Sequence, residues 1–323
     1  MRGERADRLY RAGVGLLAGA VPVALGAIAV FVLVDALPAL RYMGLGFWTG
    51  TQWNLGNQYG GTTASQNGVV AAAGATFGIL PYILGTLLTS AVALAVALPL
   101  GVGAALFLSE YAPPRLRLWL SSLVELLAGV PSVVYGLWGL AVVVPAVAGG
   151  IGPWLSAALG FIPFLRGPVG TGLGLLSAGL VLAVMVLPLI AATARDAMQQ
   201  TPRALREGAV ALGLTRWEAI AGVVLPTARP AIFGAAILAL GRALGETMAV
   251  LMVSGGSINL LPTNLYGPVN TLAAVIASQL DAAFTDATHM ALHALAGIAL
   301  TLFVISLVVN GTARLIVRRE GAA

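Results

Sequence analysis

Two opposite charges stand inside an almost entirely apolar stretch of this sequence. Arg242 and Glu246 interrupt the run "AIFGAAILALGRALGETMAVLMV" at 231–253. An ionised side chain at the centre of a membrane costs about 2.5–3.5 kcal/mol on insertion scales, and an ion pair one helical turn apart returns only about 0.2–0.5 kcal/mol in water. A guanidinium can, however, hold an anion through two parallel hydrogen bonds. We therefore predict that both charges face a polar path for an anion. A structural ion pair with another helix is the alternative.

A second group of polar residues lies in the apolar stretch "ELLAGVPSVVYGLWG" at 125–139. Glu125 is an acid that could pair with Arg242 or line the same cavity. The Gly-Val-Pro sequence after it interrupts helical regularity beside two hydroxyl groups, those of Ser132 and Tyr135. These three residues are the further candidates for a substrate path.

The composition requires a membrane environment for these residues. The chain has 323 residues, a mean hydropathy of +0.95 and only 9% charged residues, whereas soluble proteins typically have about 25%. A membrane-spanning helix needs about 20 mostly apolar residues. We therefore predict an all-α polytopic membrane protein with one transmembrane domain covering 1–323. The six expected spans lie near 12–36, 80–108, 119–147, 173–194, 230–253 and 288–310.

Several residue types are missing, and their absence restricts the chemistry. There is no cysteine, and all 17 basic residues are arginine, so the chain has neither a thiol site nor the lysine of a nucleotide-binding P-loop. If the protein uses ATP, another chain must hydrolyse it. His289 and His293 are one helical turn apart, but no acid or thiol completes a metal site, so we expect no metal. The arginines are not interleaved with aromatic residues as in nucleic-acid sites, and we expect no nucleic-acid partner.

The positions of the arginines predict the orientation. If the N-terminus lies inside the cell, Arg41 and Arg166 are the only arginines in external loops, and Arg242 lies within a span. All other arginines then fall in cytoplasmic segments, as the positive-inside rule requires. We therefore expect both termini in the cytoplasm, an external loop at 38–78, and membrane lipid around the spans.

The expected cytoplasmic segment 195–229 has more local structure than a simple connection needs. The sequence Thr201-Pro202 is typical of a helix start, and Gly213 of a helix end. Thr215 and Glu218 then have the spacing of a capping box, which would start a second helix. We predict a helix, a glycine corner and a second helix closed off by Pro226, suited to docking a cytoplasmic partner. An amphipathic segment lying on the membrane is the alternative.

The stretch "EGAVALGLTRWEAIAGVVLP" within this segment resembles the EAA signature of the permeases of ATP-binding-cassette (ABC) importers. The matching residues are Glu207, Ala209, Gly213, Leu225 and Pro226. Gly208 replaces the first Ala of the signature, and Val223 stands where Ile is usual. The resemblance implies a type I ABC-importer permease fold in which this segment is the coupling helix. It also implies that ATP and Mg are bound by two copies of a separate cytoplasmic ATPase, with no cofactor in this chain.

The stretch "GRALGETMAV" around the two intramembrane charges is similar to the C-type permease subunit of phosphate importers. "YILGTLLTS", "ALFLSEYAP" and "MQQTPRALREGA" agree with the same subunit, and the resemblance runs from about residue 80 to the C-terminus. It implies a phosphate permease in the bacterial inner membrane, with a homologous second permease subunit and an extracytoplasmic phosphate-binding protein as partners. The shorter "RALGE" also resembles permeases for sulfate and molybdate, so import of another oxyanion, tungstate included, is an alternative.

A channel or an intramembrane enzyme is a further alternative from a different class. The chain has no G-x-S-x-G or H-E-x-x-H motif that would favour an enzyme, and a channel would not need the elaborate segment at 195–229. We therefore expect a transporter subunit without catalytic residues of its own.

Overall fold

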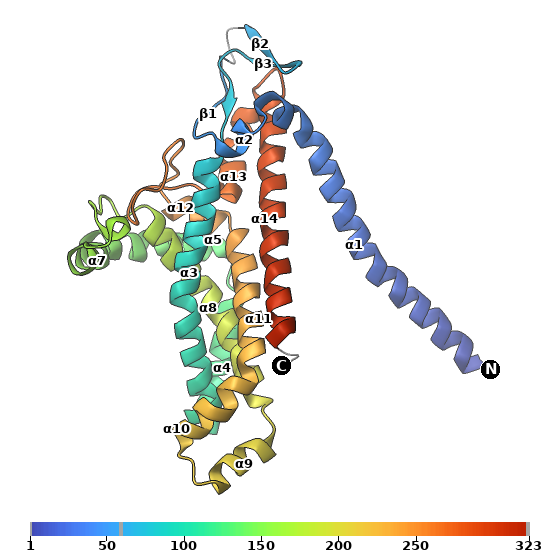
Figure 1. Ribbon diagram of the computed structural model, residues 1–323, viewed down its shortest axis with the longest axis vertical. Coiled ribbons are helices and arrows are strands. Elements are labelled where there is room, and N and C mark those ends of the chain that lie inside the picture. Colours follow the sequence, from blue (N-terminus) through green and yellow to red (C-terminus); the bar gives the residue numbers. More distant parts are fainter. Residues whose placement is uncertain (1, 58–60, 321–323) are drawn as a thin grey trace.

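The computed structural model describes residues 2–57 and 61–320, and most of them are helical (Figure 1). Within these residues, six helices are long and apolar enough to cross a membrane. They cover Gly13–Met43, Leu80–Tyr111, Ser132–Leu159, Leu175–Gln199, Arg216–Leu244 and Met290–Thr312. This confirms the predicted all-α architecture with six spans.

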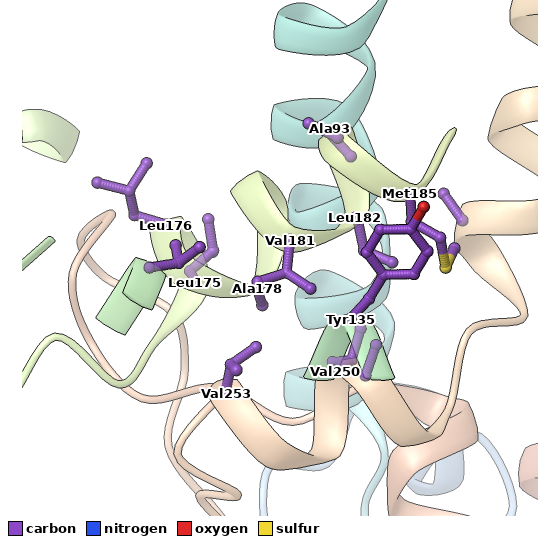
Figure 2. Packing of buried hydrophobic residues seen from close by; sticks show 14 of the residues in the cluster. Ala93, Tyr135, Leu175, Leu176, Ala178, Val181, Leu182, Met185, Val250 and Val253 are labelled. Carbon is purple, nitrogen blue, oxygen red and sulfur yellow. The ribbon is translucent and has the colours of Figure 1, made fainter. Parts of the chain in front are cut away.

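Four long helices form the body of the molecule: α3 (Leu80–Leu106), α8 (Leu175–Gln199), α11 (Leu225–Leu244) and α14 (Met290–Glu320). The contact between α3 and α8 is the most extensive one in the molecule, and α11 packs against both α8 and α14. The α8 segment is the most enclosed of the spans. Figure 2 shows side chains of α8, among them Leu182 and Met185, packed beside Tyr135 and Val250 from two shorter helices.

Helix α1 (Arg2–Met43) diverges from this body (Figure 1). It packs against α14, where Asp35 Oδ1 lies 3.1 Å from His293 Nδ1. Large apolar side chains along its membrane-spanning part, such as Phe31, are exposed in the isolated chain. Because water does not solvate such a surface favourably, lipid or another protein must cover it.

The described residues of the region 44–57 and 61–79 cap one end of the bundle, opposite to the end that carries α9 and α10 (Figure 1). They form one short helix and two antiparallel pairs of strands, β1 with β4 and β2 with β3. Their bounds are α2 Gly46–Thr49, β1 Trp53–Asn54, β2 Thr63–Gln66, β3 Val69–Ala72 and β4 Thr76–Phe77. A core of Phe47, Trp53, Phe77 and Tyr82 holds this cap on α3.

The third span differs from the predicted 119–147. A separate helix, α4 (Pro114–Ala128), comes first, and the chain then breaks before the span begins at Ser132. The break falls at Pro131, which has no N–H group and disfavours helical geometry in the residue before it. The span is a continuous succession of α-helical and π-helical turns: α5 Ser132–Trp138, η2 Gly139–Val143, α6 Val144–Ala146, η3 Val147–Ile151 and α7 Gly152–Leu159.

The fifth span also differs from the predicted 230–253. The helix starts earlier, at Arg216, and ends at Leu244, after which the short helix α12 (Met248–Val253) follows a break. Two prolines, Pro226 and Pro230, lie in this helix without ending it. Pro226 is the second residue of α11, which follows the π-helical turn η5. It is tolerated there because the change from π-helical to α-helical hydrogen bonding does not need the one N–H group that proline lacks.

The remaining elements connect these spans or cover their ends. They are the π-helical turn η1 Phe107–Tyr111, the 3₁₀ turn η4 Pro163–Leu165, the helices α9 Arg203–Ala211 and α10 Arg216–Ala219, the π-helical turn η5 Ile220–Val224, and helix α13 Leu272–Phe284.

The start of α14 is fixed by the buried carboxylate of Asp286. Burial by itself raises the pKa of Asp286, but hydrogen bonds from the Ala291 N–H and from Thr288, with His289 nearby, lower that pKa below its ordinary value of 3.8. The carboxylate therefore stays charged at neutral pH, where a negative group at a helix N-terminus is stabilising.

Candidate functional site

Arg242 lies in the last turn of α11 and is exposed in the isolated chain. Among the residues that the structure describes, it forms no hydrogen bond and no ion pair. The helix ends at Leu244, so Glu246 does not follow Arg242 by one turn of the same helix, as its spacing in the sequence suggested. Glu246 instead accepts a hydrogen bond from Ala249 N at 3.2 Å and so caps α12. The two charges therefore do not lie one turn apart on the same helix, and the alternative of an ion pair between Arg242 and another helix is not formed among the described residues.

The break after Arg242 adjoins the break before α5. Tyr135 of α5 is buried, and its hydroxyl donates to Leu127 O at 2.7 Å, across the break between α4 and α5. Gly136 packs so closely on α12 that an added Cβ would lie 3.0 Å from the Ala249 Cα and 2.7 Å from a Met252 side-chain sulfur. Only glycine permits this approach.

The two breaks are adjacent because α5 packs on α12, the helix that follows the break after Arg242. Arg242 is within electrostatic range of the Tyr135 hydroxyl. Ser132 is the first residue of α5, one turn before Tyr135. Irregular backbone within a membrane is tolerated where it is buried in protein or lines a polar cavity. The adjoining breaks, with Arg242, Ser132 and Tyr135, are the candidate polar zone, and a guanidinium without a protein partner can donate two hydrogen bonds to an anion.

Glu125 is placed differently from either prediction made for it. Its Oε1 lies 3.2 Å from Nη2 of Arg195 on α8, so it does not pair with Arg242. Arg195 is buried and also bonds Asp196 at 2.8 Å. The pair borders a surface cavity of about 360 Å³ between α4 and α8, whose other polar lining residues are Arg117, Ser121, Ser122 and Gln199.

Arg195 was missed as a site residue because its sequence position suggested a cytoplasmic loop. It belongs to the last turns of α8, a helix that continues to Gln199. The adjacent Arg195-Asp196 pair directly after a long apolar run was a signal that a buried arginine pairs with acids at a helix end.

The segment after α8 forms a projecting elbow, defined by residues 201–219. Helix α9 starts at Arg203, directly after Thr201-Pro202 as predicted, but Pro202 is its N-cap residue and Thr201 provides no side-chain cap. Gly213 has a φ of +81°, as a helix-ending glycine requires. The predicted capping box is confirmed, because Thr215 Oγ1 accepts from Glu218 N at 3.4 Å and Glu218 Oε2 accepts from Thr215 N at 2.7 Å.

The elbow continues directly into the fifth span instead of closing at Pro226. Helix α10 passes through the turn η5 into α11, so Leu225 and Pro226 belong to the membrane helix. A continuous helix is a stiffer connection than the hinge that a proline stop would have given.

The elbow exposes apolar side chains, although it projects from the bundle (Figure 1). Ala209 is buried and Glu207 is exposed, while four large side chains are strongly exposed, with Leu212 at 84%. These four are Leu205, Val210, Leu212 and Trp217. Apolar groups gathered on a small projecting element indicate a surface that another protein covers.

A bundle of six spans, two adjoining helix breaks with an unpaired arginine, and a projecting apolar elbow define a membrane-embedded transport component. Comparison with known proteins agrees with this class. Residues 97–321 match the family described as "Binding-protein-dependent transport system inner membrane component".

Relatives and one solved structure extend the match. The chain is 49% identical to "Phosphate transport system permease protein PstC 1" of Mycobacterium tuberculosis, over 89% of this chain and 86% of that protein. It is 38% identical to "Phosphate transport system permease protein PstC" of Xylella fastidiosa, over 99% of this chain and 94% of that protein. An inward-facing structure of the MetNI methionine ABC transporter shares the fold, with a TM-score of 0.52 at 20% identity over 73% of this chain and 93% of that chain.

The chain therefore belongs to the family of binding-protein-dependent transport system inner membrane components, within the group of PstC-type permease proteins. It is a multi-pass membrane protein of that family.

Proposed function

We propose that this chain is the permease subunit of an ATP-driven importer of inorganic phosphate. The observation that carries the proposal is the exposed, unpaired guanidinium of Arg242 at the two adjoining helix breaks. A charge within a membrane span is costly unless a partner or a ligand neutralises it. The names of relatives that match nearly the whole chain specify the anion as phosphate.

The geometry supports a path in which Arg242 binds the anion and its neighbours complete the coordination. The guanidinium can donate two parallel hydrogen bonds to phosphate oxygens. Glu246 lies in the break that follows Arg242, and its carboxylate can accept a hydrogen bond from the hydroxyl group that hydrogen phosphate carries at neutral pH and sulfate lacks. The hydroxyls of Ser132 and Tyr135 offer further hydrogen bonds.

The elbow would dock on a cytoplasmic ATPase, two copies of which bind ATP and Mg. This chain lacks the lysine that a P-loop needs. The apolar side chains of the elbow supply the docking surface, and Glu207 and Gly213 shape its joint. The cytoplasmic orientation rests on the arginine distribution, and α14 ends on the same side of the molecule as the elbow (Figure 1).

Further partners would cover the surfaces that the isolated chain leaves exposed. A homologous second permease subunit, together with lipid, would cover α1 and enclose Arg242 in a path between the two subunits. A phosphate-loaded extracytoplasmic binding protein would dock at the opposite end, on the strands and loops of 44–79. ATP binding would move the elbow and open the path outward, and hydrolysis would let phosphate leave inward.

Transport by the reconstituted complex tests this function. The chain would be co-expressed with a second permease subunit and an ATPase from the same organism, and purified into liposomes with the binding protein added outside. We expect ATP-dependent uptake of radiolabelled phosphate, with sulfate, molybdate and tungstate excluded. Uptake of one of those anions instead would support the oxyanion alternative. Phosphate flux without ATP would support a channel and contradict the proposal.

A further inference from the structure

The elbow is tied to the end of the second span by an ion pair that sequence patterns did not reveal. Glu110 lies in the π-helical turn η1, at the end of the helix that begins with α3. Arg206 of α9 donates from Nη1 to both Glu110 oxygens, at 2.8 and 2.7 Å. Its Nη2 donates to Met198 O of α8 at 2.6 Å. A single side chain thus joins the elbow to the ends of two membrane helices.

A second arginine attaches the other arm of the elbow to the same place. Arg216, at the start of α10, donates to the backbone carbonyl of Glu110. Its guanidinium also lies 4.7 Å above the ring of Tyr111, a cation–π distance. The two arms on either side of the Gly213 corner therefore meet neighbouring residues of one turn.

A small apolar core lies directly behind these contacts. It joins α3, α8, η5 and α11 at the elbow end of the bundle, through Ala105, Ala194, Met198, Val224 and Ala228. Because packed interiors are close to incompressible, a displacement of this cluster moves the ends of these helices together. Helices α8 and α11 also contribute to the core that contains Tyr135 and Ala243, beside the polar zone of Arg242.

The Glu110–Arg206 pair differs from the surface ion pairs that contribute little. The Glu110 side chain is 10% exposed and that of Arg206 28%, so solvent screens the pair less than an open one. Charge-assisted bonds to both carboxylate oxygens also fix the direction of the contact. Arg203, three residues earlier in α9, is exposed and has no hydrogen bond or ion pair among the described residues, so a positive charge on this helix does not by itself produce the tie.

We propose that Glu110 and Arg206 are positioning residues that form a strut between the elbow and the membrane helices. The strut transmits displacement of the elbow to α3 and α8 and thereby links ATP hydrolysis to opening of the path. This inference rests on the proposed function, since it assigns the element through which an ATPase would act.

The number of phosphate ions moved per ATP hydrolysed tests the strut. In liposomes with the complete complex, Glu110→Gln and Arg206→Gln should lower this ratio by at least about 5-fold, the lower range of coupling between distant sites. The matched control Arg203→Gln removes the same charge from the same helix and should leave the ratio unchanged. The double variant Glu110→Arg/Arg206→Glu restores opposite charges and should recover part of the ratio, which a merely local loss of stability would not allow.

A distance measurement keeps the test independent of transport. The natural chain has no cysteine, so spin labels at Ala204→Cys in the elbow and Leu100→Cys in α3 report a single distance. We expect a narrow distribution that Arg206→Gln broadens and Arg203→Gln does not. If the wild-type complex fails to import phosphate, the proposed function fails while this distance still decides the strut. Wild-type coupling and an unbroadened distance in Arg206→Gln would overturn the strut.

Discussion

Arg242 and Arg206 stand near helix ends in two regions of this molecule and have opposite surroundings. Arg206 donates three hydrogen bonds, two to Glu110 and one to Met198 O. Arg242 forms none among the described residues, although it lies within a span. Arg206 is satisfied by the chain itself, so its role is mechanical. Arg242 lacks such a partner, so its role requires something from outside the chain.

The difference follows from what each region must do. An element that transmits force has to keep one geometry, and bonds to two helices give it that. A group that binds and releases an anion must not be neutralised permanently by its own protein. An internal carboxylate on Arg242 would compete with every arriving anion, and the break after Leu244 removes Glu246 from that position.

The largest effect should come from replacing the unpaired arginine. Arg242→Gln removes two charge-assisted hydrogen bonds, each worth about 1.5–3 kcal/mol, which corresponds to a loss of at least about 100-fold in phosphate uptake. Arg242→Lys keeps the charge but loses the planar fork, so its rate of phosphate uptake should lie between that of the wild type and that of Arg242→Gln. Initial rates in liposomes measure both, and Arg166→Gln, at an exposed loop arginine, is the control. Normal uptake by an assembled Arg242→Gln complex would remove Arg242 from the path.

Breaking the elbow corner should have the next largest effect. Gly213 has a φ of +81°, whereas proline is fixed near about −65°, so Gly213→Pro cannot keep the corner between α9 and α10. We expect phosphate-stimulated ATPase activity to fall by about 10-fold or more, within the usual range of coupling between sites. Gly208→Ala is the matched control, since an added Cβ there meets nothing within 4 Å. Full stimulation in Gly213→Pro would contradict the assignment of the elbow as the coupling element.

The smallest effect should come from Glu125, whose partner has a second acid. The Glu125 side chain is 62% exposed, and Arg195 keeps its bonds to Asp196 when Glu125 is replaced. Glu125→Gln should therefore lower the free energy of unfolding by no more than about 1 kcal/mol, as measured by thermal unfolding in detergent. Phosphate uptake in liposomes should stay within about 2-fold of the wild-type rate. Loss of uptake as severe as in Arg242→Gln would place Glu125 in the path and end its classification as a partnered, structural charge.

Features encoded by neighbouring residues were predicted well from the sequence. The number of spans follows from apolar stretches long enough to cross a membrane. The capping box at Thr215 and Glu218 and the corner at Gly213 depend on contacts within a few residues, and the structure has both. The bounds of the third and fifth spans were predicted less well. Hydropathy averaged over about 20 residues does not reveal a break in a helix such as the one at Pro131.

Partners distant in the sequence could not be predicted, for a definite reason. Glu110 and Arg206 are 96 residues apart, and Glu125 and Arg195 are 70 apart. Nothing in a local pattern specifies which of several acids meets which of 17 basic residues. That choice depends on how α3, α4 and α8 pack.

The sequence by itself determined that this protein lives in a membrane, contains no nucleotide-binding lysine, and has an arginine in an apolar span together with a capped elbow. Those properties depend on residue types and on spacings of a few residues, and both can be read directly from the sequence. Only the tertiary structure decided that Arg242 has no partner among the described residues, that Glu246 caps α12, and that Arg206 connects the elbow to two spans. These facts depend on where helices end and on which helix ends meet, and packing of the whole chain sets both.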